Sequence, residues 1–326
     1  MSNKQQDPLS KLKSCTPQVL EIRENFKRDY KLSCPVIDDD DVFAKSLQIA
    51  DLTSEWHDYH GMSLRHPDLN EYRKEIRNQI THSISSIKGF SEIPIQPYNY
   101  TYTGSRTYLE NQNTGKKLVS IDLVKGNYQS LRHLGIQYVL GTGTYEELIN
   151  KFTDEKCMIT SKFFRQMVFG LLRPDLQASV QRNLLGRLIT EVFKVNQYSI
   201  ASLSNDEVVL HVSSDADLHK IESILKAANT PVQYRLSLFR VEKIPNSYGD
   251  DWYVKYYIDS IDHHKITQVP PIPQSKNKKR LMGVHVRYLM QVANFIEGNE
   301  NTEKDFWWRE RGRLCKLLEP ERFGTS

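Results

Sequence analysis

KLVSIDLV, residues 117–124, and YSIASLSNDEVVLHVSS, residues 198–214, decide the fold. The first stretch alternates in character, so its odd-numbered apolar residues share one face of a predicted strand and Asp122 lies on the other. The second stretch contains two strand patterns around Ser204-Asn205-Asp206. Because Asn and Asp tolerate the positive φ that tight turns require, we predict a β-hairpin there.

Helical patterns fill the chain between and after these strands. Three of them separate the first strand from the hairpin, at residues 128–134, 145–152 and 161–195. Pro174 should interrupt the last. After the hairpin, Ser214 and Asp217 begin a further helix as a capping box, and strand patterns follow at 232–241 and 252–258. The order strand, helices, strand, strand, helix, strand matches the split βαβ plan of ferredoxin-like sheets, which is also the palm of nucleic-acid polymerases.

The predicted fold class is therefore α+β, with a ferredoxin-like or palm antiparallel sheet between helical N-terminal and C-terminal subdomains. Residues 1–95 have apolar residues at helical spacing and form the first subdomain. Residues 96–265 form the palm-like domain, with a reduced fingers insertion at 127–195. Residues 266–326 form a linker and a C-terminal helical lobe, in which the segments 284–296 and 302–318 are predicted to be helices.

Composition limits the class of protein. Of 326 residues, 39% are hydrophobic and 26% are charged, which is typical of a folded chain. The start, MSNKQQDPLSKLKSC, lacks the apolar region of a signal peptide, and no stretch approaches the ~20 apolar residues of a membrane span. With four scattered cysteines, we expect free thiols in the cytoplasm or another reducing intracellular compartment, and no membrane partner. The net charge of +4 permits a nucleic-acid partner without requiring one.

Two aspartates carry the functional prediction. In a split βαβ sheet the first strand and the hairpin are neighbours, so Asp122 and Asp206 should lie side by side. Convergent carboxylates repel unless a cation lies between them, and their oxygens suit Mg²⁺ or Mn²⁺ together with substrate phosphates. Two such ions about 3.5–4 Å apart can activate a 3′-hydroxyl and stabilise a leaving pyrophosphate. The predicted reaction is nucleotidyl transfer.

Three segments resemble a known family. SIDLVKGNYQSLR (120–132) looks like the first palm motif of template-dependent polymerases. NDEVVLHV (205–212) resembles the His-Asp-Glu hairpin motif of family A DNA polymerases and the matching hairpin of single-subunit RNA polymerases, with Asn205 where a His is usual. SKFFRQMVFG (161–170) is similar to the fingers helix of that family. The resemblance covers residues 117–213.

The resemblance implies a template-dependent nucleotidyltransferase that uses a nucleic-acid primer and template and nucleoside triphosphates. It makes Asp122 and Asp206 metal ligands, and it gives Glu207 a role in supporting the primer end or the metals. The nucleotide-binding candidates are Lys125, Asn127, Tyr128, Lys162, Arg165 and Phe169. Among these, Phe169 would stack near the nascent base pair.

Each candidate also has a structural explanation. Asn-Asp is common turn chemistry, which alone accounts for Asp206, and Asp122 could end an exposed strand. Arg182 and Arg187 are predicted to be solvent-facing charges on a long helix. A basic cluster is interpreted first as a solvated linker and second as a phosphate-binding strip: Lys276, Lys278, Lys279 and Arg280. The alternatives to a polymerase are a non-catalytic nucleic-acid-binding or assembly protein on the same sheet, and a two-metal nuclease.

Overall fold

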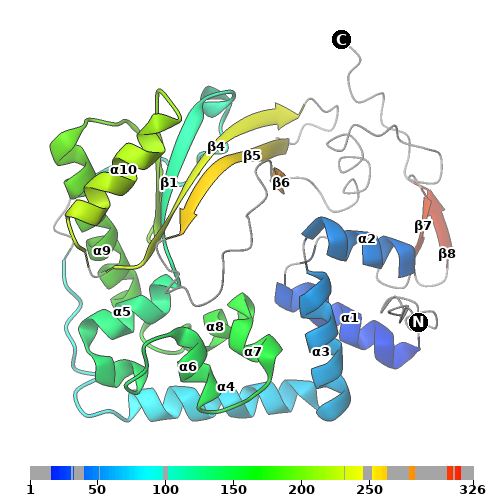
Figure 1. Ribbon diagram of the computed structural model, residues 1–326. Coiled ribbons are helices and arrows are strands. Elements are labelled where there is room, and N and C mark those ends of the chain that lie inside the picture. Colours follow the sequence, from blue (N-terminus) through cyan, green and yellow to red (C-terminus); the bar gives the residue numbers. More distant parts are fainter. Residues whose placement is uncertain are drawn as a thin grey trace, which may run out of the picture. The chain divides into compact units, whose positions relative to one another are not determined.

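The computed structural model is an α+β protein (Figure 1). It describes residues 16–30, 32, 40–50, 52–97, 102–230, 232–244, 252–262, 279–282, 307–310 and 313–316. The described parts of Met1–Arg77, Phe152–Arg165 and Val284–Ser326 form one compact unit, and those of Asn78–Lys151 and Gln166–Gly283 form a second. Within these ranges, every helix is too short or too polar to cross a membrane.

The first unit is built mainly from helices. They are α1 (Pro17–Tyr30), α2 (Asp40–Ala50), α3 (Thr53–Arg65), the start of α4 (Leu69–Ser85) and α7 (Lys156–Thr160). Phe26 lies at its centre, with its ring 5.2 Å from Trp56 and 5.3 Å from Tyr59, both edge-on. The buried carboxylate of Asp29 accepts hydrogen bonds from the Tyr59 hydroxyl, at 2.8 Å, and from Arg73. The predicted helices of the N-terminal segment are confirmed.

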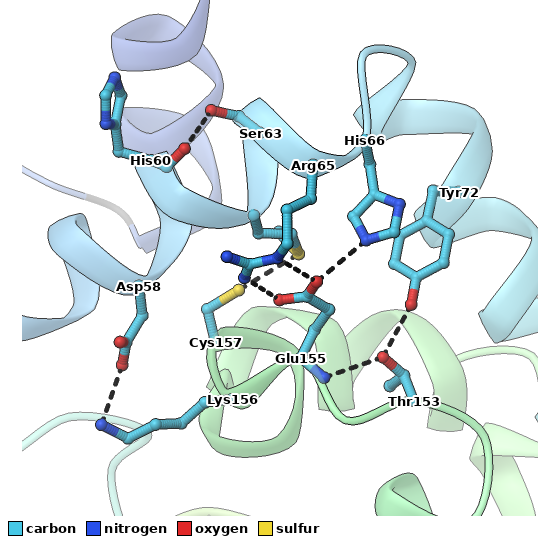
Figure 2. Close-up of polar contacts among 11 residues, drawn as sticks. Asp58, His60, Ser63, Arg65, His66, Tyr72, Thr153, Glu155, Lys156 and Cys157 are labelled. Atoms are coloured by element: carbon cyan, nitrogen blue, oxygen red, sulfur yellow. Dashed lines mark hydrogen bonds and ion pairs between the residues drawn. The ribbon is translucent and has the colours of Figure 1, made fainter.

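A polar cluster around Glu155 ties α3 and α4 to the segment that leads into α7 (Figure 2). Arg65 donates to both oxygens of the Glu155 carboxylate, at 2.9 and 2.6 Å, and His66 Nε2 lies 2.9 Å from Oε1. The His66 ring stacks on Tyr72 at 3.7 Å, and the Tyr72 hydroxyl bonds Thr153 at 2.8 Å. The hydrogen bonds from Arg65, together with the one contact with His66, lower the pKa of Glu155 in spite of its burial.

An open antiparallel sheet forms the centre of the second unit. Its strands are β1 (Lys117–Leu123), β2 (Ile200–Leu203), β3 (Glu207–His211), β4 (Tyr234–Ile244) and β5 (Trp252–Asp262), in the order β2-β3-β1-β4-β5. The short strand β6 (Lys279–Met282) pairs with β5. The central strand β1 therefore has β3 on one side and β4 on the other.

Helices cover one face of this sheet. The helices that lie in or enter the second unit are the end of α4, α5 (Gly126–Leu134), α6 (Tyr145–Asn150), α8 (Lys162–Phe169), α9 (Pro174–Val195) and α10 (Ala216–Ala227), with 3₁₀ turns at Asn111–Asn113 and Ile136–Val139. Figure 1 shows α9 and α10 along the same side of the strands. The odd-numbered residues of β1, Val119 to Leu123, are buried against them in one apolar cluster with Leu188 and Leu218. The predicted alternation of β1 is confirmed.

The other face of the sheet is only partly apolar. Leu118, Val209 and Phe239 pack there with Tyr108. Lys255 is buried among these rings, with its ammonium 3.7 Å from the centroid of Phe239 and 3.2 Å from the Tyr108 hydroxyl. This face carries the even-numbered residues of β1, and thus Asp122.

Local signals in the sequence mark the starts of two helices, although the cap position of the second is Asp215, and the bonds of the predicted capping box that form are those to Asp217. Pro174 is at the first position of α9, where its missing N–H costs nothing. Asp217 accepts the amides of Ser213 and Ser214 at 3.0 and 2.9 Å, at the start of α10. Burial would raise the pKa of Asp217, but these bonds lower it overall.

The hairpin between β2 and β3 is confirmed, with a different turn chemistry. Neither Asn205 nor Asp206 has a positive φ. Instead the Ser204 hydroxyl accepts the amides of Glu207 at 3.0 Å and Asp206 at 3.4 Å. A serine that bonds the backbone two and three residues ahead closes the turn in ordinary backbone geometry.

The prediction of a helix over residues 302–318 is wrong for its described part. Trp307–Glu310 forms strand β7 and Arg313–Lys316 forms strand β8, paired antiparallel. Adjacent tryptophans favour strands, and glycine, present at position 312, is a poor helix former. The helix predicted over 284–296 falls outside the residues that the structure describes.

Candidate functional site

The end of β1 meets the hairpin turn. Asp122 is directly opposite Glu207 in the β1–β3 ladder, and the Leu123 amide donates to the Asp206 carbonyl at 2.8 Å. Asp122 and Asp206 are therefore diagonal neighbours. A strand spacing of about 5 Å and a rise of about 3.4 Å per residue place their Cα atoms roughly 6 Å apart.

The three carboxylates divide between the two sides of this strand end. Asp122 and Glu207 share the face opposite the helices, because residues directly opposite in a ladder point the same way. The buried Ser120 hydroxyl donates to Glu207 Oε1 at 2.5 Å and fixes that side chain on the face. Asp206 is exposed in the turn, and a Cβ added to Gly126 would lie 3.5 Å from its Cβ. Asp206 thus lies toward the start of α5.

A basic residue, Arg235, is the third charged residue in line with Glu207 and Asp122 on the sheet face opposite the helices. Arg235 of β4 is directly opposite Asp122, so Glu207, Asp122 and Arg235 follow one another across three strands. A guanidinium beside a carboxylate offsets its negative charge without a metal ion. No local signal in the sequence marks Arg235, because the pairing of β1 with β4 joins residues far apart in the chain.

Lys125, two residues after the end of β1, has an unusual, left-handed backbone conformation. Its φ of 52° and ψ of 48° are left-handed, and it occupies the position just before α5. Such a conformation in a non-glycine residue costs of order 1 kcal/mol and turns the chain sharply. Its ammonium pairs with Glu146 and lies 6.0 Å from the centre of the Tyr145 ring. In this structure Lys125 is therefore directed to α6.

Asn127 and Tyr128 differ in their availability to a ligand. Asn127 is half-buried, and its Oδ1 accepts a 2.7 Å hydrogen bond from Gln181 Nε2. The Tyr128 side chain is 2% exposed and donates from its hydroxyl to the Thr142 carbonyl at 2.8 Å; burial raises its pKa. Asn127 keeps a side-chain NH₂ that can reach a ligand, whereas Tyr128 supports the core.

The predicted fingers helix contributes little to this site. Phe169 is fully buried, with its ring 6.2 Å from Tyr145. Lys162 is exposed and Arg165 is half-buried, and both belong to the first unit, whereas the three carboxylates belong to the second. The site is thus confined to the second unit.

The predicted phosphate-binding strip is described only in part. Lys276 and Lys278 fall outside the described residues. Lys279 and Arg280 begin β6, paired with Tyr256 and Lys255. Only the course of their backbone is established.

Two residues of α9 join the site although sequence reasoning did not assign them to it. Gln181 bonds Asn127, and Arg182 Nε donates to Asn205 Oδ1 at 2.5 Å. The prediction that Arg182 is a solvent-facing charge is confirmed, and this exposed side chain also reaches the hairpin turn. No local signal could reveal this contact, because it joins positions 23 apart through the packing of a helix on a hairpin.

The protein could offer a divalent metal ion two carboxylates here, those of Asp122 and Asp206. Within the described ranges, no group of three or more His, Cys, Asp or Glu side chains could hold a metal ion. Asp122 and Asp206 supply two carboxylates from adjoining backbone positions, on different sides of the strand end, and Mg²⁺ is commonly bound by one or two carboxylates with waters and substrate phosphates. Each carboxylate has the chemistry of a Mg²⁺ ligand, and the other positions of the shell would have to come from water and a nucleotide.

Comparison with known proteins finds no counterpart. No protein-family model, curated protein or solved structure matches this chain. What the site can do therefore follows from its own side chains: neighbouring carboxylates at a strand end, an amide donor beside them and a cation in the same row.

Proposed function

We propose that this protein is a template-dependent nucleotidyltransferase of the palm type, which extends a nucleic-acid primer with nucleoside triphosphates. The observation that carries the proposal is the register of β1 against the hairpin, which makes Asp122 a neighbour of both Asp206 and Glu207. The strand order β2-β3-β1-β4, with α9 and α10 on one face, supports a ferredoxin-like or palm sheet.

Each side chain has a task in this proposal. Asp122 and Asp206 would hold Mg²⁺ or Mn²⁺, which when bound supplies charge for the triphosphate and lowers the pKa of the attacking hydroxyl. Glu207, fixed by Ser120, would accept a hydrogen bond from the 3′-hydroxyl of the primer. The NH₂ group of Asn127 would donate to a phosphate oxygen of the nucleotide.

Primer extension tests the proposal. A labelled primer on DNA and RNA templates is incubated with Mg²⁺ and nucleotides, and wild type is compared with Asp122→Asn and Asp206→Asn. Both variants should lose incorporation by roughly a hundredfold or more, because each removes a charge that acts in the transition state. The matched control is Asp215→Asn, since Asp215 pairs with Lys117 at 2.9 Å at the opposite end of β1. The control should retain activity.

Two results would redirect the proposal. Incorporation that survives Asp206→Asn would remove the metal role of the hairpin and reject the polymerase. Shortening of the labelled primer by the wild type without nucleotides, lost in both variants, would instead identify a two-metal nuclease with water as nucleophile.

A non-catalytic nucleic-acid-binding or assembly protein is the second candidate. Arg235 favours it, because a guanidinium in register with Asp122 gives that carboxylate a charged neighbour without any metal. Binding of primer–template that is equal in EDTA and in Mg²⁺, and unchanged by Asp122→Asn, would support this candidate.

A further inference from the structure

Two consecutive residues of α9 contact the two segments that carry the aspartates. Gln181 Nε2 donates to Asn127 Oδ1 at 2.7 Å, and Asn127 is in the first turn of α5, just beyond the end of β1 that carries Asp122. Arg182 Nε donates to Asn205 Oδ1 at 2.5 Å, and Asn205 directly precedes Asp206. One rigid helix thus holds both segments.

The backbone of α5 approaches this helix closely. A Cβ added to Gly126 would lie 3.3 Å from Gln181 Cδ and 3.5 Å from Asp206 Cβ. Gln181 is 5% exposed, so its contact is shielded from solvent, whereas Arg182 is exposed and acts at the rim. The start of α5, the middle of α9 and the hairpin turn therefore meet around Gly126.

The ladder alone gives the turn limited support. The last bond between β1 and the turn is from the Leu123 amide to the Asp206 carbonyl, at 2.8 Å. Beyond that bond the chain leaves β1 and passes through Lys125, with its left-handed backbone, while the hairpin reverses through Ser204. The two segments diverge there, so α9 holds them at a second place beyond the ladder.

We propose that Gln181 and Arg182 form a positioning bracket that fixes the separation of Asp122 and Asp206. Its catalytic consequence rests on the proposed nucleotidyl transfer. The bracket residues touch neither substrate nor metal and act through Asn127 and Asn205. Since a misplacement of about 1 Å can cost as much as about a hundredfold in rate, loosening the bracket should lower turnover more than binding.

Steady-state primer extension with Mg²⁺ separates positioning from simple stability. In the double variant Gln181→Leu with Arg182→Met, kcat should fall about tenfold or more, while KM for the nucleotide stays within about twofold. Arg182→Lys should restore much of the loss of Arg182→Met, because an ammonium can still donate to Asn205. Arg187→Gln, on the exposed side of the same helix, is the control and should behave as wild type.

Amide hydrogen exchange tests the bracket independently of any enzymatic activity. The Leu123 amide should exchange about tenfold faster in the double variant than in wild type, while amides at the far end of β1 stay unchanged. Should the double variant not fold, Arg182→Met alone, at an exposed site, carries the same comparison.

The outcomes are distinguishable. A kcat that falls only as far as the folded fraction falls, with no rescue by lysine, overturns the bracket. If wild type extends no primer, the proposed function fails, and the Leu123 amide decides: faster exchange in the variant supports the bracket, and unchanged exchange overturns it.

Discussion

Single residues at the end of β1 have partners that determine their chemistry. Asp122 has a carboxylate, Glu207, opposite it on one side and a guanidinium, Arg235, on the other. Glu207 is fixed by Ser120, whereas Asn127 is oriented by Gln181. Because Asn127 Oδ1 accepts a hydrogen bond from Gln181, the NH₂ group of Asn127 is the group that would donate to a ligand.

A substitution at Gln181 that should turn the Asn127 amide around tests this orientation. In Gln181→Glu, the new carboxylate can only accept, so Asn127 should turn its NH₂ toward residue 181 and present its oxygen outward. An outward oxygen repels phosphate, and KM for the nucleoside triphosphate in primer extension should rise about tenfold. Gln197→Glu, an exposed residue just after α9, makes the same charge change and should have no effect. An unchanged KM in Gln181→Glu would contradict the role of Asn127.

Glu155 gives a prediction for pH. Its folded-state pKa is lowered from the ordinary 4.5, so its contribution to stability is complete above that value and is lost as pH falls through the lower folded pKa. Glu155→Gln should therefore reduce stability near pH 7 by about 1–2 kcal/mol, with a smaller difference from wild type at about pH 3.

Thermal unfolding by circular dichroism across this pH range measures the effect of Glu155→Gln. The matched control is Glu92→Gln, at an exposed position. A difference between wild type and Glu155→Gln that is the same at every pH would show that the ionised form of Glu155 gives no special stability.

At the scale of elements, α9 has two roles. Its apolar side packs on the sheet with residues such as Leu188, Ile189 and Val192, all essentially buried. The adjoining positions Gln181 and Arg182 reach the site. Packing of the apolar side of α9 on the sheet therefore determines where Gln181 and Arg182 lie relative to the strand ends.

Truncating the core of α9 should destabilise the second unit. Leu188→Ala removes a fully buried side chain and leaves a cavity, so unfolding should become easier by about 2–5 kcal/mol in urea titration. Val195→Ala, at a side chain that is 60% exposed, should change stability by less than about 0.5 kcal/mol. A similar decrease in the free energy of unfolding in both variants would mean that the buried apolar side of α9 does not stabilise its packing.

At the scale of the whole molecule, charge decides how a nucleic acid would be attracted. The net charge is +4, and four of the basic residues follow the proline run: Lys276, Lys278, Lys279 and Arg280. If this strip contacts phosphates, binding should weaken with salt, with a slope of about −0.9 per neutralised phosphate in a plot of log K against log salt.

Replacing that strip by glutamine should reduce the salt slope by roughly 3–4. Fluorescence anisotropy of a labelled duplex over a range of salt concentrations measures it. The control replaces four exposed lysines of the second unit by glutamine and should change the slope less: Lys116, Lys194, Lys220 and Lys226. Equal changes in the two variants would show that only net charge matters.

The sequence by itself determined the elements that are specified by short-range chemistry. Alternation in 117–124 predicted β1 and its buried face, because a strand has a period of two. Pro174 located the start of α9, and Asp217 the start of α10, through bonds to their own neighbours. The hairpin followed from two apolar runs around a polar triplet, although Ser204 closes the turn and not a positive φ.

Only the tertiary structure decided which residues meet. The register of β1 with β4 placed Arg235 beside Asp122, and the packing of α9 brought Gln181 and Arg182 to Asn127 and Asn205. Packing also buried Tyr128 and Phe169, which were expected to contact a nucleotide. These outcomes depend on segments far apart in the chain, whose contacts leave no periodic trace in the local sequence. The adjacency of Asp122 and Asp206 in the backbone could therefore be predicted, whereas the side-chain contacts around them could not.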